Sequence, residues 1–432
     1  MSISRRNLLR GASGVAALSM LGSLQGQAQT GHRVVVVGGG FAGSTFARYL
    51  SLWGGSDFSI TMVDPREGHS SCVMSNLVLT NELSLAQLTF SHEPLAGRFG
   101  FHTEMASVTK IDATARRIDL DNGKSLPYDS LILATGIEFD DIPGYDPALI
   151  PHAWIAGDST EQLRQQLNTE LPPGGTVVMT IPQAPYRCPP GPYERACLLA
   201  AMAQKITDDA GGSGVHGSPT VVVLDANSGI QAEKATFTAA FNNLYGDVIK
   251  YVPDAKLISV DAINRGVETT AGSYAGDVLN VIPNHRAPAL LRDAGLTAKG
   301  PWALVDPVTY ESSVEGFDDI YVIGDAQATG QPKSAHMANA QAKVCADAVM
   351  RKASGLATHS VERLDNITTN SACFSPVSFT EAAWLTAVFR YNQTAQVMEL
   401  APNSLGASEG WDRESYRDMY DWANNLFSDT FV

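Results

Sequence analysis

A glycine-rich turn between two apolar segments near the N-terminus is the feature that most limits the fold of this chain. Residues 33–37 predict a short strand, a helix is expected after the turn, and a second strand ends at Asp64. The turn carries a G-x-G-x-x-G spacing at Gly38, Gly40 and Gly43. Such glycines let backbone N–H groups approach a pyrophosphate at the positive end of a helix, and an acid about twenty residues later takes the ribose hydroxyls. The segment therefore predicts a dinucleotide-binding fold in which the three glycines and Asp64 bind the cofactor, and we expect that cofactor to be FAD.

A second nucleotide-type fold is predicted further along the chain, but its turn has no glycine motif. The strand expected over 176–181 is followed by Pro-Gln-Ala-Pro-Tyr-Arg-Cys-Pro-Pro-Gly at 182–191. A helix over 192–206 and a strand over 220–224 complete the pattern. Because the tyrosine and the prolines would keep a pyrophosphate away from the backbone amides, we expect no NAD(P)H here. Electrons are instead expected to enter through a cysteine-based site at Cys188.

Two further strand ends belong with the first glycine motif. Apolar runs at 131–136 and 320–325 end in small residues, and a helix is expected over 332–350 with its N-terminus toward a ring that carries negative charge. The side chain of Asp325 is placed to reach a ribityl hydroxyl. The cofactor-binding residues predicted from these two strand ends are Thr135, Gly136, Gly324 and Asp325.

These patterns predict an α/β protein with two dinucleotide-binding (Rossmann-like) domains of the FAD-linked disulfide reductase type and a C-terminal α+β cap. The cap is inferred from a final segment rich in aromatic residues. The predicted domains are a split FAD-binding domain at 29–152 and 252–365, a second Rossmann-like domain at 153–251, and a cap or interface domain at 366–432.

The first 28 residues are predicted to be a signal peptide. Arg5 and Arg6 form a twin-arginine pattern, an apolar run follows at 11–24, and small residues at 26–28 offer a cleavage site. The alternative is a chance arginine pair before a general secretory signal. We therefore expect the periplasm, reached by export of the folded protein, as the location.

Charge and composition exclude some classes of partner. The formal net charge of −15 opposes nucleic acid and anionic lipid surfaces and favours a basic partner. No run of eighteen or more apolar residues follows the N-terminal segment, so no stable membrane insertion is expected.

The cysteines do not follow metal or haem spacing. None of the five lies in a C-x-x-C pattern, and the histidines show no metal-ligand spacing, so no metal site is predicted. We interpret Cys197 and Cys345 as core thiols. Five histidines are interpreted as surface or hydrogen-bonded side chains, namely His69, His92, His152, His285 and His336. Cys188 lies beside Arg187 and near a helix N-terminus, which predicts a lowered thiol pKa.

Several motifs together resemble the flavoprotein subunit of flavocytochrome c sulfide dehydrogenase. They are the glycine turn at 38–43, Ser-Cys-Val-Met-Ser-Asn at 71–76, Tyr-Arg-Cys-Pro-Pro-Gly-Pro-Tyr-Glu-Arg at 186–195, Val-Ile-Gly-Asp at 322–325 and Ala-Cys-Phe-Ser at 372–375.

The resemblance implies specific roles. Cys72 would link covalently to the 8-methyl group of FAD. Cys188 and Cys373 would form a redox disulfide beside the flavin, Glu194 would accept a proton near it, and Trp422 would be an aromatic neighbour of the ring. The substrate implied is sulfide, and the partner is a separate c-type cytochrome.

Three rival functions are weighed against this one. A sulfide:quinone oxidoreductase shares the fold and the disulfide chemistry but needs an apolar and basic C-terminal surface. The acidic tail disfavours that surface. A non-catalytic flavin electron carrier or assembly factor has no use for a disulfide over the flavin, and the missing second glycine motif disfavours an NADH-dependent disulfide reductase. The acidic tail residues are Asp412, Glu414, Asp418, Asp421 and Asp429.

Overall fold

The first sheet carries the glycine turn. The structure, a computed structural model, describes residues 31–209, 220–298 and 300–432, so the predicted signal peptide lies outside the described residues. Five parallel strands are arranged in the order β19-β9-β1-β2-β5. The strands are β1 (His32–Val37), β2 (Phe58–Asp64), β5 (His102–Met105), β9 (Ser130–Leu133) and β19 (Ile320–Val322). This parallel sheet confirms the first predicted nucleotide fold.

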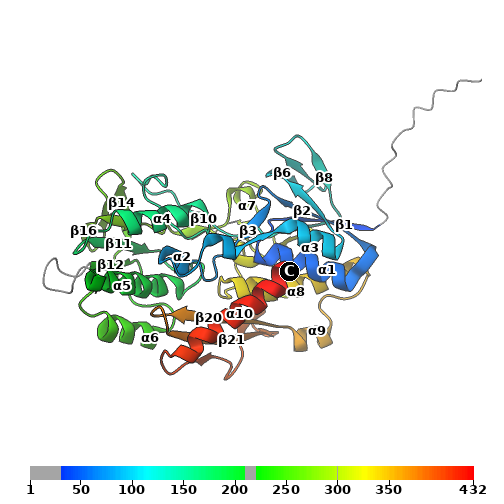
Figure 1. The fold of residues 1–432 in the computed structure, drawn as a ribbon. Coiled ribbons are helices and arrows are strands. Elements are labelled where there is room, and N and C mark those ends of the chain that lie inside the picture. The colour runs from blue at the N-terminus through cyan, green and yellow to red at the C-terminus, as the bar shows by residue number, and fades with distance from the viewer. Residues whose placement is uncertain (1–30, 210–219, 299) are drawn as a thin grey trace, which may run out of the picture. The chain divides into compact units, whose positions relative to one another are not determined.

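Two long helices cover this sheet. α1 (Phe41–Gly54) begins directly after the glycine turn and packs against α8 (Ala335–Ala353), and Figure 1 shows the two helices side by side. Their contact is apolar and closely packed, with Phe46, Leu50 and Ala342 fully buried in one cluster. α8 matches the helix predicted over 332–350, and the hydroxyl of Ser334 caps it by accepting a hydrogen bond from the N–H of Met337.

The second sheet also has parallel pairing, in the order β13-β12-β11-β17. Its strands are β11 (Thr176–Ile181), β12 (Thr220–Asp225), β13 (Ile249–Val252) and β17 (Val278–Asn280), with α5 (Gly191–Asp209) connecting β11 to β12. The expected boundary at residue 251 is wrong, because β17 pairs with β11 beyond it.

The reason is a small antiparallel sheet between β13 and β17. β14 (Leu257–Asp261), β15 (Gly266–Thr269) and β16 (Gly272–Ala275) form this sheet. Val260 and Val267 from it share one buried cluster with Val178 and Leu279 of the second sheet. Apolar burial therefore holds residues 252–280 against the second fold and not in the FAD domain, where the sequence had placed them.

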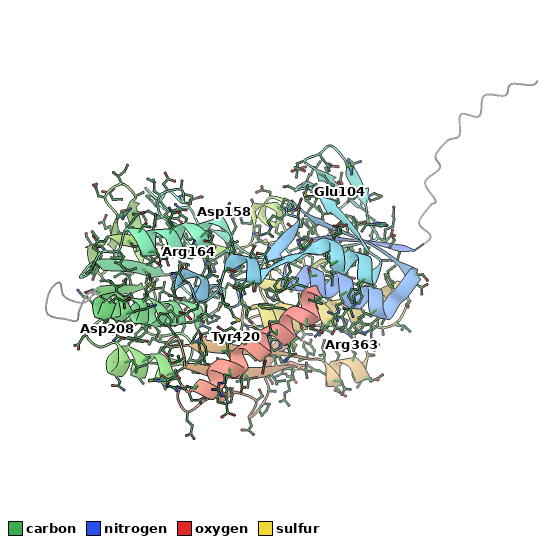
Figure 2. All side chains as sticks on the ribbon, viewed as in Figure 1. Glu104, Asp158, Arg164, Asp208, Arg363 and Tyr420 are labelled. Carbon is green, nitrogen blue, oxygen red and sulfur yellow. The ribbon has the colours of Figure 1, made fainter. Side chains whose placement is uncertain are left out.

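The C-terminal segment forms the predicted α+β cap. β20 (Thr368–Pro376), β21 (Ala382–Asn392), β22 (Val397–Leu400) and β23 (Gly406–Ala407) make an antiparallel sheet, and α10 (Arg413–Phe431) follows it. The end of α10 returns to the first fold, where Phe431 packs on Phe41 and Asp429 pairs with Lys343 at 2.7 Å. α9 (Val361–Asn366) is tied to α8 by Arg363, which is labelled in Figure 2 and pairs with Asp347 at 2.6 Å.

The remaining elements are short. They are β3 (Gly68–Ser70), α2 (Asn76–Leu79), β4 (Thr89–Ser91), α3 (His92–Phe99), β6 (Val108–Asp112), β7 (Arg117–Leu120), β8 (Ser125–Pro127), β10 (Glu138–Phe139), α4 (Asp158–Thr169), α6 (Lys234–Ala239), β18 (His285–Arg286) and α7 (Ala289–Asp293). Across the described residues, no helix has the length and apolar character needed to cross a bilayer.

Candidate active site

Three cysteines that are far apart in the sequence line one pocket. Cys72 comes from the loop before α2, Cys188 from the turn before α5, and Cys373 from the middle of β20. Glu194, in the first turn of α5, and Trp422, on α10, line the same pocket. The first fold, the second fold and the cap thus each contribute a thiol to a single site.

The turn before α5 holds Cys188 in an unusual backbone conformation. Its φ of 59° lies in the left-handed region, which non-glycine residues rarely adopt. Residues held in such conformations are concentrated at active sites and ligand sites. Its N–H donates to the carbonyl of Lys333 at 2.7 Å, and its carbonyl accepts from the N–H of Gly191 at 3.0 Å. A Cβ at Gly191 would lie 2.8 Å from the Cys188 sulfur, so glycine there makes room for the thiol.

The thiols themselves differ from expectation in two ways. All five cysteines are free, so no bond joins Cys188 to Cys373 in this structure. Burial raises the pKa of Cys188 well above its usual value, and the neighbouring Cys373 and Glu194 add to that effect. The predicted lowering by Arg187 is present but smaller than the cost of burying a thiolate. The predicted core thiols Cys197 and Cys345 are fully buried.

Glu194 is a buried carboxyl held by one amide. The side-chain amide of Asn76 donates to its Oε1 at 2.9 Å. Burial raises the pKa of Glu194 to about 8, and the nearby Glu233 also raises it, whereas Asn76 and Arg195 lower it. A carboxyl whose pKa lies in this range can exchange protons near neutral pH.

Sequence reasoning missed the residues that fix Glu194 in place. Arg195 is 1 % exposed, and its Nε donates to Asn76 Oδ1 at 2.9 Å. One Nη donates to Asn280 at 2.8 Å, and the guanidinium lies 4.9 Å from the ring centre of Trp154. The available signal was an arginine at the start of the apolar helix 196–203, where a charge is rare unless it is fully hydrogen-bonded.

The predicted glycine turn has the geometry of a nucleotide cradle. Gly38 has a φ of 100°, and a Cβ there would meet the carbonyl oxygen of Ala134 at 2.5 Å. A Cβ at Gly43 would lie 1.8 Å from the carbonyl oxygen of Gly38. At Gly40 a Cβ would reach only ordinary contact with His69, at 3.4 Å. The chain itself therefore does not require glycine at position 40, whereas the close approach of a pyrophosphate would.

The acid at the end of β2 lines a surface groove next to this turn. Asp64 Oδ2 accepts from the N–H of Gly39 at 2.8 Å, and Oδ1 accepts from the N–H of Arg66 at 2.9 Å. The groove also contains His92 and Glu104, of which Glu104 is labelled in Figure 2. Binding of a ribose by Asp64 remains a prediction.

Two buried polar atoms lack a partner where a cofactor is expected. Thr135 Oγ1 and Asp325 Oδ1 accept and donate no hydrogen bond within the described chain. Gly136 and Gly324 stand beside them with φ values of 70° and 75°. Buried polar atoms in proteins are nearly always satisfied. These orphaned oxygens at the ends of two parallel strands therefore fit the hydroxyls and polar edge of FAD.

Three histidines are less ordinary than their sequence spacing suggested. His69 is half-buried, but both of its ring nitrogens are buried without a hydrogen-bond partner in the described chain, and desolvation lowers its pKa to about 3. His92 and His285 each bury one nitrogen without such a partner. The interpretation of these side chains as surface or satisfied groups is wrong, because spacing in the sequence reports nothing about burial.

The acid that ends the second strand of the second fold is already hydrogen-bonded. Asp225, which ends β12, accepts hydrogen bonds from the hydroxyls of Tyr193 at 2.8 Å and Tyr251 at 2.7 Å. Its other oxygen accepts from the N–H of Asn227 at 2.9 Å. Tyr186 is 2 % exposed and fills the turn where a glycine motif would stand.

Comparison with known proteins agrees with the two folds. Residues 32–177 match the pyridine nucleotide-disulphide oxidoreductase family, and residues 160–283 match the family described as the sulfide dehydrogenase (flavocytochrome c) flavoprotein chain, central. The class defined by the fold and site is thus a two-Rossmann oxidoreductase. The fold itself is of the Rossmann type found in FAD-linked oxidoreductases.

Several proteins similar to this chain are named for reactions of sulfide. A mitochondrial sulfide:quinone oxidoreductase from Mus musculus is 24% identical over 330 residues, which are 73% of this chain and 70% of that protein. A sulfide dehydrogenase (flavocytochrome c) flavoprotein chain from Chlorobaculum thiosulfatiphilum is 48% identical over 46 residues, 11% of this chain and 94% of that sequence. The solved sulfide:quinone oxidoreductase of Aquifex aeolicus superimposes with a TM-score of 0.71 at 15% identity, covering 93% of this chain and 92% of that one, which shows the shared fold.

Proposed function

We propose that this protein oxidises sulfide through Cys188 and Cys373 and passes the electrons by way of FAD to a c-type cytochrome. The observation that carries the proposal is the meeting of these two thiols and Glu194 in one pocket at the junction of the folds. The matched sulfide dehydrogenase segment, which includes Cys188 and Glu194, supports sulfide as the substrate.

The chain's own residues account for the sulfur chemistry. When Cys188 and Cys373 are joined, hydrosulfide attacks one sulfur and forms a new S–S bond, and the other sulfur leaves as a thiolate. Glu194 accepts the proton carried by the incoming sulfur. Bound FAD supplies the conversion from two-electron to one-electron transfer. Cys72, in the same pocket, is the residue proposed to anchor the flavin covalently.

The second fold supports the absence of NAD(P)H from the cycle. The carboxylate of Asp225 is already saturated by Tyr193, Tyr251 and Asn227. A nicotinamide nucleotide would have to break these buried hydrogen bonds to use that acid.

The outer face of α10 supports a protein acceptor. The exposed side chains of this helix include three acids, Glu414, Asp418 and Asp421, and two bases, Arg413 and Arg417. Figure 2 labels Tyr420 of the same helix. Asp412 and Asp429 are used internally, the first as the cap of α10 and the second in the pair with Lys343. Three acids against two arginines leave one net negative charge among these side chains, and this excess attracts a basic protein and repels anionic lipid.

Quinone is the second candidate acceptor, favoured by the alignment with the mouse enzyme over most of the chain. Stopped-flow mixing under argon tests both sulfide as the electron donor and cytochrome c as the electron acceptor. Sulfide should bleach the flavin within seconds, whereas NADH and NADPH should not. Reoxidation should then be fast with a basic c-type cytochrome and slow with a short-chain ubiquinone. Faster reoxidation by the quinone would show that quinone, and not cytochrome c, is the electron acceptor. A flavin that sulfide does not bleach would show that the protein is a non-catalytic flavin carrier.

The periplasm is proposed as the location on the basis of the N-terminal arginine pair. Replacing Arg5 and Arg6 together by lysine should leave the protein in the cytoplasmic fraction. Continued export of that variant would show that the twin-arginine route is not used.

A further inference from the structure

A second acid, Glu233, stands in a strained conformation near the thiol pocket. It precedes α6 with φ 47° and ψ 42°, in the left-handed region. Its side chain makes no capping hydrogen bond to its own helix. A non-glycine residue held in this region is a reason to look for function, because the surrounding structure must maintain it.

The Glu233 side chain is directed at the strand that carries Cys373. The hydroxyl of Ser375 donates to Glu233 Oε2 at 2.6 Å, and Ser375 is fully buried. Glu233 Oε1 is buried with no hydrogen-bond partner in the described chain. Ser375 and Cys373 are two residues apart on β20, so their side chains lie on the same face of that strand. In Figure 1, α6 is drawn beside one end of β20, as this hydrogen bond requires.

Acidic and thiol groups face Glu233 from the neighbouring elements, whereas the adjacent Lys234 is exposed. Glu194 and Cys197 face it from α5, and Cys373 faces it from β20. Within the described part of the chain, no ion pair offsets its charge. Burial raises the pKa of Glu233 to about 7, and Ser375 opposes that rise. Burial also raises the pKa of Cys373 to about 12, with Glu233 the largest charged contributor and Glu194 the next.

We propose that Glu233, held by Ser375, is a positioning residue for Cys373 and the second proton acceptor of the site, alongside Glu194 for Cys188. The inference rests on the proposed function. When the two free thiols close, one S–S bond forms and two S–H bonds break. Each carboxylate takes one of the two protons from a thiol, and bound FAD would take up the two electrons together with one of these protons, while the other proton stays on its acid until solvent removes it. Two buried acids therefore match the two protons that the thiol pair must release.

The test uses the FAD-loaded protein and two readouts. In Glu233→Gln the hydrogen bond from Ser375 can persist while the charge is lost. With the flavin and thiols reduced, alkylation of Cys373 by iodoacetamide is followed by mass spectrometry from pH 7 to 10. Removing the negative charge should lower the pKa of Cys373 by about one unit, so alkylation at a given pH should be about tenfold faster.

The second readout is the rate of flavin reduction by sulfide as a function of pH. It should fall about tenfold in Glu233→Gln and lose the ionisation near pH 7, with the KM for sulfide unchanged. Glu409→Gln is the matched control, because Glu409 is an exposed acid of the cap, which carries Cys373, and its replacement changes the net charge equally. Both profiles of this control should superimpose on wild type.

A second variant protects the test against misfolding. Ser375→Ala frees the Glu233 side chain and should change the Cys373 alkylation profile, whether or not Glu233→Gln folds. Alkylation profiles identical to wild type in whichever of these variants fold would overturn the proposal. If sulfide does not bleach the wild-type flavin, the proposed function fails separately, and the alkylation profile still decides the role of Glu233.

Discussion

The two nucleotide folds of this chain both have a central strand that leads through a turn into a helix, but the first turn is rich in glycine and the second is filled by side chains. β1 leads through Gly38, Gly40 and Gly43 into α1, and β11 leads through a tyrosine, prolines and Cys188 into α5. In the first turn the backbone packs so closely that a methyl group at two of the glycines would strike a carbonyl oxygen. In the second turn side chains occupy the corresponding space.

The polar atoms of the two folds show the same contrast. The first fold leaves Thr135 Oγ1 and Asp325 Oδ1 buried without a partner in the described chain, as a cofactor site would. The second fold saturates Asp225 with tyrosine hydroxyls. One scaffold can therefore hold either a nucleotide or a reactive thiol, and the turn between the first strand and its helix decides which.

Making the first turn more like the second should have the largest effect. In Gly43→Ala the new Cβ would lie 1.8 Å from the carbonyl oxygen of Gly38, a separation that cannot be met without moving the turn. We expect less than about a tenth of the wild-type FAD content and a loss of several kcal/mol in the free energy of unfolding. Flavin absorbance per protein and chemical denaturation measure the two quantities.

The control is another glycine replaced by alanine. Gly97, in α3, has open space around its Cβ position, and alanine there favours the helix. Gly97→Ala should keep full FAD content. Normal flavin content in Gly43→Ala would show that FAD binding does not depend on the close packing of the first turn.

Removing the thiol that fills the second turn should abolish turnover and spare the cofactor. Cys188→Ser or Cys373→Ser should lower sulfide oxidation by at least about 10³-fold, because the S–S bond that hydrosulfide attacks cannot form. FAD content should remain normal, since neither residue lies in the glycine turn. Cys345→Ser, at a buried thiol outside the pocket, should lose some stability and little rate. Residual sulfide oxidation within tenfold of wild type in Cys188→Ser would place the chemistry elsewhere.

The sequence alone predicted those elements of the two folds that depend on local residue patterns. Both strand–turn–helix units, α8 and the α+β cap were predicted because apolar periodicity and glycine spacing act over a few residues. The extent of the second fold was not predictable in this way. Its last strand, β17, joins through apolar packing of Val260 and Val267, which pattern alone does not assign to one sheet or the other.

The site was predictable only in part for the same reason. Cys188, Glu194 and Cys373 were named from motifs, but the charge state of the thiol was misjudged because burial outweighs Arg187. Asn76 and Arg195 lie inside the quoted motifs at 71–76 and 186–195, but their roles beside Glu194 come from tertiary hydrogen bonds. Glu233 lies in no motif and is linked to β20 through Ser375. Sequence reports which groups are present, whereas desolvation and hydrogen bonding decide how they titrate.

A covalent link between FAD and Cys72 would distinguish the two folds further, because the first fold would then hold a cofactor that cannot dissociate. Cys72 lines the thiol pocket, and burial raises its pKa. Acid precipitation of wild type should leave yellow colour in the pellet, and Cys72→Ala should release it to the supernatant, with sulfide oxidation reduced about tenfold or less. Complete release from the wild type would show that FAD is bound without a covalent link.

The smallest expected change in stability tests whether Glu194, which follows the second turn, is as buried as its contacts indicate. The folded pKa of Glu194 is about 8, raised chiefly by burial, against an ordinary value near 4.5. Below about pH 4 both the folded and the unfolded protein hold this proton. As pH rises, the unfolded chain releases it first, so the contribution of Glu194 to stability is lost progressively up to about pH 8 and is level above that. Glu194→Gln, which keeps an oxygen for the amide of Asn76, removes this dependence.

The melting temperature of this variant relative to wild type should therefore rise by several degrees between pH 5 and pH 9, while flavin reduction by sulfide slows about a hundredfold. Glu409→Gln, at an exposed acid, should show neither change. A constant difference in melting temperature across this pH range would mean that Glu194 titrates as an ordinary surface carboxyl, and the second turn would then lack a group able to take the proton near neutral pH.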